Sequence, residues 1–215
     1  LLEAEGLRVA IVPQPNWRDD LRDFKKMGRP RLFFAVSAGC MDSMVNKYTA
    51  NRRLRSEDAY TPDGRHDMRP EYATTVYSTA LKSIYPDSAV IIGGIEASMR
   101  RFTHYDYWQD CLKPSILVES GADWLCYGMG ERTMIEFTKA IEAGRNVNDI
   151  RKIPQLGFYM DGRCKVKDAV ILNSYERCTK DKVAFAENFH VIETYANMLT
   201  PPVLVEPVGN GYVQI

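Results

Sequence analysis

Two segments that end in glycines hold the residues best placed to bind a ligand. An apolar, β-branched run at Ala89–Ile92 ends in Gly93-Gly94, and a second short run stops at Gly128-Met-Gly130. Because glycine lacks a Cβ, a ligand or another backbone can approach it closely. Ligands of open α/β sheets bind outside the carboxyl ends of the strands, so both segments predict a binding edge. The polar candidates just beyond these glycines are Glu96, Ser98, Arg100, His104 and Glu131.

Both glycine patterns also have a purely structural interpretation. Gly93-Gly94 could be a tight turn that needs a positive φ, which glycine adopts without steric cost. The second pattern lacks the third glycine of a dinucleotide fingerprint and follows a late strand rather than the first one. Glu131 and Thr133 suit the first turn of a helix, where acidic and capping residues are favoured. The second pattern therefore favours a helix start over a nicotinamide site.

A third polar loop follows the apolar run Leu32–Val36. Backbone N–H groups at a helix N-terminus can hold an anion or the edge of a cofactor, which makes Ser37 and Gly39 binding candidates. The next polar pair, Asp42 and Ser43, could equally provide the N-cap of the helix. Both interpretations place this loop at the same edge as the glycines.

Aromatic and basic side chains gather in two further stretches. The run His104-Tyr-Asp-Tyr-Trp108 could stack on a flat ligand or anchor a partner, although such clusters are often buried against their neighbours. Arg52 and Arg53 belong to the one basic concentration of the chain and could contact nucleic-acid phosphates. Acidic residues from Glu57 to Asp67 lie close by, so a solvated loop of mixed charge is the favoured interpretation.

Strands and helices that alternate along the chain must position these loops. The patterns predict strands at Arg8–Val12, Leu32–Val36, Ala89–Ile92 and Trp124–Tyr127, and helices at Trp17–Met27, Met41–Ala50, Pro70–Ile84 and Thr133–Ala143, with a helical turn near Pro114–Glu119. This order is typical of a parallel sheet with helices on both faces. We predict an α/β fold, a Rossmann-like open parallel sheet flanked by helices, over residues 1–145.

The pattern changes after Gly144, which indicates a small α+β connector over residues 146–215. A hairpin is predicted around Asp161-Gly162, between Gly157–Met160 and Arg163–Val166. Ser174 could cap a long helix that runs to about Met198. Its expected buried stripe is Val183, Ala186, Phe189 and Ile192. Two final strands, Val203–Glu206 and Tyr212–Ile215, could pair around Gly209–Gly211.

Composition bounds the class of protein. The 215 residues are 45% hydrophobic and 26% charged, which is ordinary for a globular chain. Lys+Arg and Asp+Glu are both 28, so the net charge indicates neither nucleic acid nor membrane as a partner. The five cysteines are widely spaced, without a C-x-x-C pair or a zinc spacing, which fits free thiols in a reducing compartment. No apolar run approaches the roughly 18 residues of a membrane span, and we expect a cytoplasmic protein.

The opening residues also carry an expectation. The chain begins at Leu1 without a Met, and Leu1–Gly6 is typical of the last turn of a helix closed by glycine. A helix that enters without its cap indicates that upstream sequence has been removed. We therefore expect a fragment in which the first strand of the sheet is missing.

Four runs are specific enough to indicate a family. They are Phe33-Phe-Ala-Val-Ser-Ala-Gly-Cys-Met-Asp-Ser-Met44, Asp58-Ala-Tyr-Thr-Pro62, Gly93-Gly-Ile-Glu-Ala-Ser-Met-Arg-Arg101 and His104-Tyr-Asp-Tyr-Trp108. With them, and with Asp181–Ala186, the chain resembles the YgiQ-type family of radical SAM proteins over nearly its whole length. The layout of strands and glycines is also similar to the cobalamin-binding-type domain that precedes many radical SAM barrels.

This resemblance implies a parent protein that binds a [4Fe–4S] cluster through a C-x3-C-x2-C motif and cleaves S-adenosylmethionine reductively to a radical. The barrel that carries this motif would begin downstream of Ile215 and would be the partner of this segment. The cluster cysteines are absent here, so the resemblance assigns no metal ligand to this chain. None of His66, His104 and His190 stands in the D-x-H-x-x-G signature of cobalt-binding domains, so cobalamin rests on fold similarity alone.

We therefore expect the accessory domain of a radical SAM enzyme of unknown substrate. Its strand-end loops would face the cofactor or substrate, and it would hold no catalytic set of its own. The alternative, from a different class, is a non-catalytic module that binds RNA or protein through the basic and aromatic loops.

Overall fold

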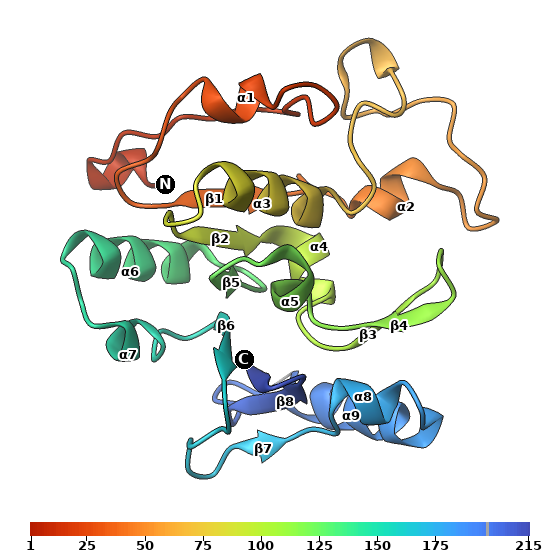
Figure 1. Cartoon of the computed structure of the whole chain (residues 1–215), viewed down its shortest axis with the longest axis vertical. Helices are drawn as coiled ribbons and strands as arrows, with labels where there is room; N and C mark the ends of the chain where they lie inside the picture. The colour runs from red at the N-terminus through yellow and green to blue at the C-terminus, as the bar shows by residue number, and fades with distance from the viewer. Residues whose placement is uncertain (197) are drawn as a thin grey trace.

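The computed structural model describes residues 1–196 and 198–215. A seven-stranded mixed sheet runs through this part of the chain in the order β1-β2-β5-β6-β9-β8-β7 (Figure 1). The strands are β1 Phe34–Ser37, β2 Val90–Gly93, β5 Trp124–Cys126, β6 Leu156–Asp161, β7 Val170–Ile171, β8 Leu204–Val208 and β9 Gly211–Gln214. A separate two-stranded sheet joins β3 His104–Asp106 to β4 Cys111–Lys113.

The first half of the sheet is parallel, as predicted. β1 pairs with β2, and β2 pairs with β5, all in the same direction. Their registers place Ser37 beside Gly93 and Gly93 beside Cys126. The carboxyl ends of the three strands therefore lie in one row, and the loops that follow them share one edge of the sheet.

The second half of the sheet is mostly antiparallel. β6 runs antiparallel to both β5 and β9, β9 runs antiparallel to β8, and only β7 is parallel to its neighbour β8. The same sheet thus continues across residue 145. Glu206 of β8 is buried and accepts a hydrogen bond from the N–H of Thr103 at 2.8 Å, which ties this half to the segment before β3.

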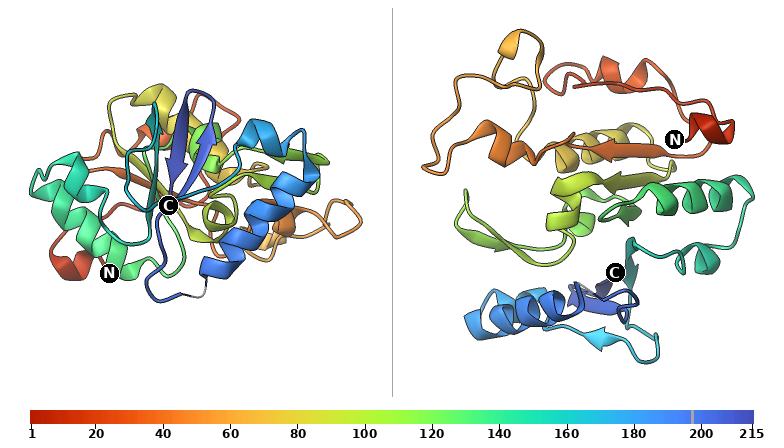
Figure 2. Two further views of the ribbon diagram at one scale, coloured as in Figure 1. Left: turned by 90° about the horizontal axis from the view of Figure 1, so that it is seen from below. Right: turned by 180° about the vertical axis from the view of Figure 1, so that it is seen from behind.

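Helices cover both faces of the parallel strands. Among them, α3 Ala73–Ile84 lies on one face and α6 Glu131–Glu142 on the other. The other α-helices of the described residues are α1 Arg22–Lys25, α2 Ser43–Lys47, α4 Gly94–Met99, α5 Ile116–Ser120, α7 Val147–Ile150, α8 Tyr175–Cys178 and α9 Lys182–Ala196. Figures 1 and 2 show α1 at one end of the molecule and α8 with α9 at the other.

Strand β2 explains why this sheet is buried on both sides. Side chains alternate between the faces of a strand, so Val90 and Ile92 pack on the α3 side with Tyr77, whereas Ile91 packs on the other side with Phe137 of α6. Val90, Ile91 and Ile92 are each at most 2% exposed. An apolar side chain of this size contributes roughly 1.5–3 kcal/mol when it is fully buried. The continuous apolar run in the sequence is therefore the expected signature of a central strand.

Several sequence predictions are confirmed. The amphipathic pattern after Pro70 forms α3, the segment after Gly130 forms α6, and the last two predicted strands pair antiparallel as β8 and β9. The α/β fold class is confirmed as well, although the sheet is mixed rather than wholly parallel.

Other predicted elements are wrong or too long. Arg8–Val12 forms no strand, and only α1 is helical within Trp17–Met27. The predicted hairpin around Asp161-Gly162 is wrong because β6 pairs with β5 and β9 instead of with Arg163–Val166. The aromatic run predicted as a loop begins with β3.

The predicted helix from Ser174 to Met198 is interrupted. Ser174 does cap a helix, but only the short α8, because its hydroxyl accepts from the N–H of Arg177 at 3.2 Å. The carboxylate of Asp181 then accepts from the N–H of Val183 at 2.9 Å, as an N-cap does, and a second helix starts there. Residue 197, within the predicted span, lies outside the described residues.

The predicted buried stripe of this helix is wrong at Val183, Ala186 and Phe189, whereas Ile192 is partly buried against the core. Asn188 exchanges hydrogen bonds of 2.7 and 2.8 Å with the backbone of Asn173, which turns Asn188 and Ala184 inward. Val183 and Phe189, both predicted to be buried, are exposed on the other side. A buried amide therefore sets the rotation of α9 where the apolar pattern indicated a different face.

Candidate functional site

A cavity of about 270 Å³ lies at the carboxyl ends of β1, β2 and β5. Its floor is apolar and its rim is made of glycines. The lining residues are Ala35, Val36, Ser37, Ile91, Ile92, Gly93, Gly94, Cys126, Gly128, Gly130 and Met134. The predicted Ser37, Gly93, Gly94, Gly128 and Gly130 thus come together around one space, which we call the edge pocket.

Gly94 fits both interpretations of the Gly93-Gly94 pair, the tight turn and the close approach of another group. Its φ is +81°, a left-handed conformation that side chains rarely adopt, and it begins α4 directly after β2. A Cβ on Gly94 would also lie 2.7 Å from the hydroxyl oxygen of Ser37. The tight-turn interpretation is therefore correct for this residue, and the same turn keeps the rim of the edge pocket open.

Two serines hold the rim loops in place. The hydroxyl of Ser98 donates to the carbonyl of Gly94 at 2.8 Å and accepts from the N–H of Gly128 at 3.1 Å. The hydroxyl of Ser37 accepts from the N–H of Gly39 at 3.1 Å. Ser98 and Gly39 lie outside the lining of the edge pocket, and they fix the loops that form it.

The lining of the edge pocket carries no formal charge in the described part of the chain. Burial raises the pKa of the Cys126 thiol to about 11, so this group is a neutral thiol near pH 7. Glu131 is exposed at the first turn of α6, where its negative charge already complements the helix dipole. A phosphate at the same helix end would be repelled by that carboxylate. The edge pocket is therefore suited to an uncharged, apolar or aromatic group.

The predicted Glu96 and Arg100 turn away from the edge pocket and into the protein. Glu96 is 1% exposed, and its carboxylate accepts from the N–H groups of Ser43 and Thr74 at 2.8 Å each. Arg100 forms a buried ion pair with Asp42. These two side chains thus anchor the starts of α2 and α3 to α4 and its C-cap.

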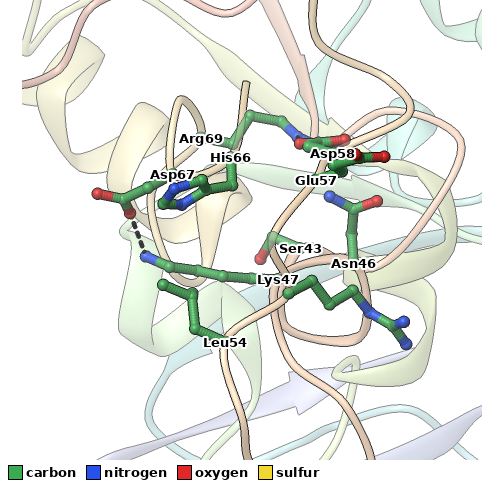
Figure 3. Close-up of a pocket in the computed structure, with 10 residues that line it drawn as sticks. Ser43, Asn46, Lys47, Leu54, Glu57, Asp58, His66, Asp67 and Arg69 are labelled. Atoms are coloured by element: carbon green, nitrogen blue, oxygen red, sulfur yellow. Dashed lines mark hydrogen bonds and ion pairs between the residues drawn. The ribbon is translucent and has the colours of Figure 1, made fainter. Parts of the chain in front are cut away.

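A small polar pocket lies between α2 and the long loop that follows it (Figure 3). Lys47 reaches Asp67 at 2.7 Å across it, and His66 and Asn46 also line it. Its volume is about 10 Å³, which leaves space for about one water molecule. This space is too small for a ligand, and the polar side chains around it join α2 to the loop that follows it.

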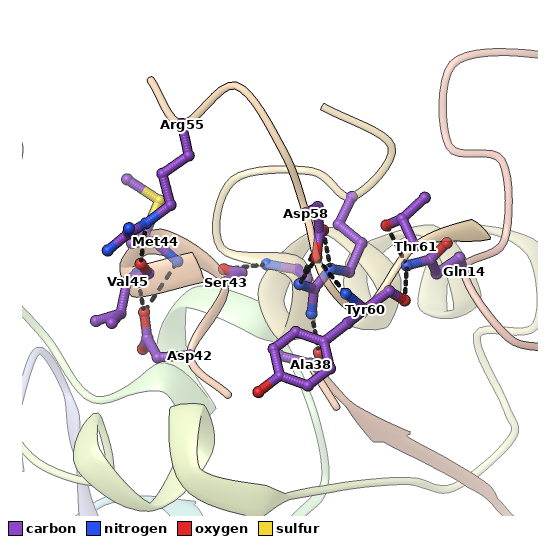
Figure 4. Close-up of polar contacts among 12 residues, drawn as sticks. Gln14, Ala38, Asp42, Ser43, Met44, Val45, Arg55, Asp58, Tyr60 and Thr61 are labelled. Atoms are coloured by element: carbon purple, nitrogen blue, oxygen red, sulfur yellow. Dashed lines mark hydrogen bonds and ion pairs between the residues drawn. The ribbon is translucent and has the colours of Figure 1, made fainter. Parts of the chain in front are cut away.

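Sequence reasoning missed the residues that hold this loop against the sheet edge. Arg69 donates to the carboxylate of Asp58 at 3.0 Å and to the carbonyl of Ala38 at 3.1 Å, and both charged side chains are buried. Figure 4 shows Asp58 and Ala38 in this group of polar contacts, with Asp42 at the start of α2. The carboxylate of Asp42 accepts from the N–H of Met44 at 2.9 Å, so Asp42 is the N-cap of α2.

His104 lies apart from the edge pocket, at the start of β3. Its Nδ1 is 3.1 Å from the carbonyl of Phe102, and its Nε2 is buried without a partner among the described residues. Burial lowers the pKa of His104 to about 4, so the ring is neutral near pH 7. Nδ1 must then carry the proton that reaches the carbonyl, which leaves a lone pair on Nε2.

The chain offers no fit to a metal cofactor in the residues that the structure describes. No group of three or more His, Cys, Asp or Glu side chains could hold a metal ion there. His66, His104 and His190 are all absent from the lining of the edge pocket, so it presents no imidazole to a cobalt ion. The described residues therefore present no ligand set for an iron–sulfur cluster, and the edge pocket presents no histidine to a cobalamin.

Within residues 1–196 and 198–215, no helix is long and apolar enough to cross a membrane.

The chain is an α/β protein with an uncharged pocket at the carboxyl ends of its parallel strands. A family model described as "Radical SAM N-terminal" matches residues 1–215. The chain belongs to this family, in agreement with the resemblance of its motifs to radical SAM proteins. No solved structure matches the chain.

The chain is also similar to curated proteins of the UPF0313 group over nearly its whole length. A UPF0313 protein of Porphyromonas gingivalis is 57% identical over 218 residues, which cover 100% of this chain and 34% of that protein. A UPF0313 protein of Bacteroides thetaiotaomicron is 54% identical, with 100% and 37% covered. One from Geobacter sulfurreducens is 44% identical, with 97% and 34% covered. The chain thus spans about a third of the length of the curated relatives it matches.

Proposed function

We propose that this chain is the accessory domain of a radical SAM enzyme, and that its edge pocket faces the place where the parent's cofactor and substrate meet. The edge pocket carries this proposal, because it lies at the carboxyl ends of three adjacent parallel strands, where open α/β sheets bind their ligands. Membership of the Radical SAM N-terminal family supports the nature of the parent. The substrate class is limited only by the chemistry of the lining.

That chemistry favours an uncharged group. Ala35, Ile91 and Met134 lie on the α6 face of the sheet and provide an apolar floor, and the glycines of the rim leave space for a flat ring to lie against the backbone. No cationic side chain in the lining offers a counter-ion to a phosphate or a carboxylate. We infer that the edge pocket takes an apolar or aromatic portion of a cofactor or substrate, whereas charged parts of the molecule are held by the rest of the parent.

The test uses the full-length parent protein, purified without oxygen and with its iron–sulfur cluster reconstituted. With a chemical reductant, the protein should cleave S-adenosylmethionine to 5′-deoxyadenosine, measured by liquid chromatography. Ala35→Phe should fill the edge pocket and lower this rate by about tenfold or more, because an added ring removes most of the space available to a bound group. Ala143→Phe, an exposed alanine beyond the end of α6, is the matched control and should leave the rate unchanged.

Absence of any cleavage by the reconstituted wild-type protein would contradict the radical SAM assignment of the parent. Full cleavage by Ala35→Phe would instead show that the edge pocket does not face the reaction site. The two failures are distinguishable because the first is measured on the unaltered protein.

One observation supports the alternative of an RNA-binding module. The guanidinium of Arg52 lies 4.5 Å from the centre of the exposed Tyr107 ring, an arrangement on which a base could also stack. If this alternative holds, the protein should retain RNA in a salt-sensitive manner, and a variant with Arg52→Ala and Arg53→Ala should lose that retention. Retention that the double variant keeps would exclude these arginines as the contact.

A further inference from the structure

Helix α4 has a charged side chain on its buried face and apolar side chains on its exposed face. A surface helix normally turns its apolar side chains inward and its charged ones to solvent. Glu96 of α4 and Arg100, the residue that caps its C-terminus, are charged and only 1% and 6% exposed. Ile95 and Met99, one turn apart, face outward and are 50% and 61% exposed. Because residues four apart share one face of a helix, these two side chains form a continuous apolar strip.

A third exposed apolar side chain extends this strip. Met129 is 80% exposed and follows Gly128, whose N–H is bound at 3.1 Å to the hydroxyl of Ser98 in α4. That hydrogen bond holds the loop after β5 against α4, the helix that carries the strip. We call Ile95, Met99 and Met129 the apolar rim, because Ile95 follows the lining residue Gly94 and Met129 stands between the lining residues Gly128 and Gly130.

We propose that the apolar rim is the docking surface for the remainder of the parent polypeptide, which would thereby close the edge pocket. Glu96 and Arg100 attach this segment to the rest of the chain through Ser43, Thr74 and Asp42. The apolar side chains on its outer face take no part in those contacts. About two thirds of the length of the relatives lies outside the matched region, which covers 34% and 37% of the first two. That remainder is tethered to this chain and is thus present at high effective concentration.

The chemistry of the rim defines the partner surface. Ile95, Met99 and Met129 are uncharged, so the surface that covers them should be apolar. Methionine side chains are flexible and polarizable, which suits them to contacts that must adapt to a second surface. The inference rests on the proposed function, because it identifies the partner that completes the same edge pocket.

Methionine oxidation in the full-length parent protein tests the proposal directly. Dilute hydrogen peroxide converts exposed Met to the sulfoxide, and mass spectrometry gives the rate at each position. Met27 is the matched control, since its 59% exposure is close to that of Met99 and it follows α1, which lies at one end of the molecule (Figure 1). Met44, which is 1% exposed, reports that the domain is folded. We expect Met99 and Met129 to oxidise about tenfold more slowly than Met27.

A charge on the rim should release the docked surface. Met99→Asp should raise the oxidation rate of Met129 to that of Met27, while Met44 stays protected; Met27→Asp should leave Met129 protected. Rates for Met99 and Met129 equal to that of Met27 in the wild-type protein would overturn the proposal. Protection that disappears on dilution would identify a second copy as the occupant and would overturn it too. Cleavage of S-adenosylmethionine is measured separately, so failure of the docking surface and failure of the proposed function are distinguishable.

Discussion

Replacement of Glu96 by Gln provides the sharpest test of how the binding edge is built. The carboxylate of Glu96 accepts two backbone N–H groups, from Ser43 and from Thr74, at 2.8 Å each. A glutamine side chain has one acceptor oxygen, so it can satisfy one of these donors. Its NH2 group would then face the second N–H, and two buried donors would oppose each other.

The cost follows from the loss of one charge-assisted hydrogen bond. Such a bond contributes about 1.5–3 kcal/mol, and a buried donor without a partner adds about 1–3 kcal/mol. We expect Glu96→Gln to lower the free energy of unfolding by about 3 kcal/mol, or the melting temperature by roughly 6–12 °C for a domain of this size. Glu96→Ala, which removes both bonds, should lower it further.

Urea unfolding followed by circular dichroism measures this effect. Glu131→Gln is the control, because that carboxylate is exposed at the start of α6 and its loss should cost less than about 1 kcal/mol. A Glu96→Gln protein within about 0.5 kcal/mol of the wild type would refute the reasoning. That result would favour the original prediction that Glu96 contacts a ligand. Its replacement would then alter ligand binding and leave the free energy of unfolding unchanged.

Two further predictions concern a buried carboxyl and a glycine. Burial raises the pKa of Glu206 from its usual 4.5 to about 7, so its protonated form stabilises the fold below pH 4.5 and this contribution is lost as the pH rises through 7. Unfolding free energies at pH 5 and pH 8 should show a loss on the order of 3 kcal/mol from this group, and Glu206→Gln should remove that difference; an unchanged pH dependence would contradict it. Gly94→Ala should cost about 1–3 kcal/mol in the same unfolding assay, because Gly94 has a positive φ and its Cβ would meet the Ser37 hydroxyl. Gly121→Ala has a positive φ but open space, so it should cost less, and equal costs would show that the contact with Ser37 is unimportant.

The parallel half of the fold could be predicted because its strongest signals are local. The continuous apolar run of β2 and the helical spacing after Pro70 each depend on one element only. The second half could not be predicted in this way, since β6 finds its partners in β5 and β9, which lie before and far after it in the sequence. The exposure of Phe189 has a similar cause, because Asn188 binds the backbone of Asn173 and sets the rotation of α9.

The candidate site likewise contains residues that local sequence signals predict and residues whose positions depend on tertiary contacts. Glycines at strand ends can be recognised from the sequence alone. Gly93, Gly94, Gly128 and Gly130 were all predicted in this way, and all four line the edge pocket. The direction of a charged side chain is decided by its tertiary partners, so the spacing of Glu96 in the sequence could not reveal that it turns inward. The face that α4 turns inward is likewise decided by tertiary contacts, such as those of Glu96 with the N–H groups of Ser43 and Thr74.

Strand β6 has a consequence for the order in which the chain folds during synthesis. The parallel strands β1, β2 and β5 are complete once residue 126 has emerged, but the outer edge of β5 then has no neighbour until β6 follows at Leu156–Asp161. The other edge of β6 in turn stays open until β9 arrives at Gly211–Gln214. Open strand edges are templates for pairing between nascent chains. The ribosome thus holds an aggregation-prone intermediate for the time needed to add about fifty residues, at the usual 5–20 residues per second a matter of several seconds, and chaperones should contact the chain most strongly in that interval.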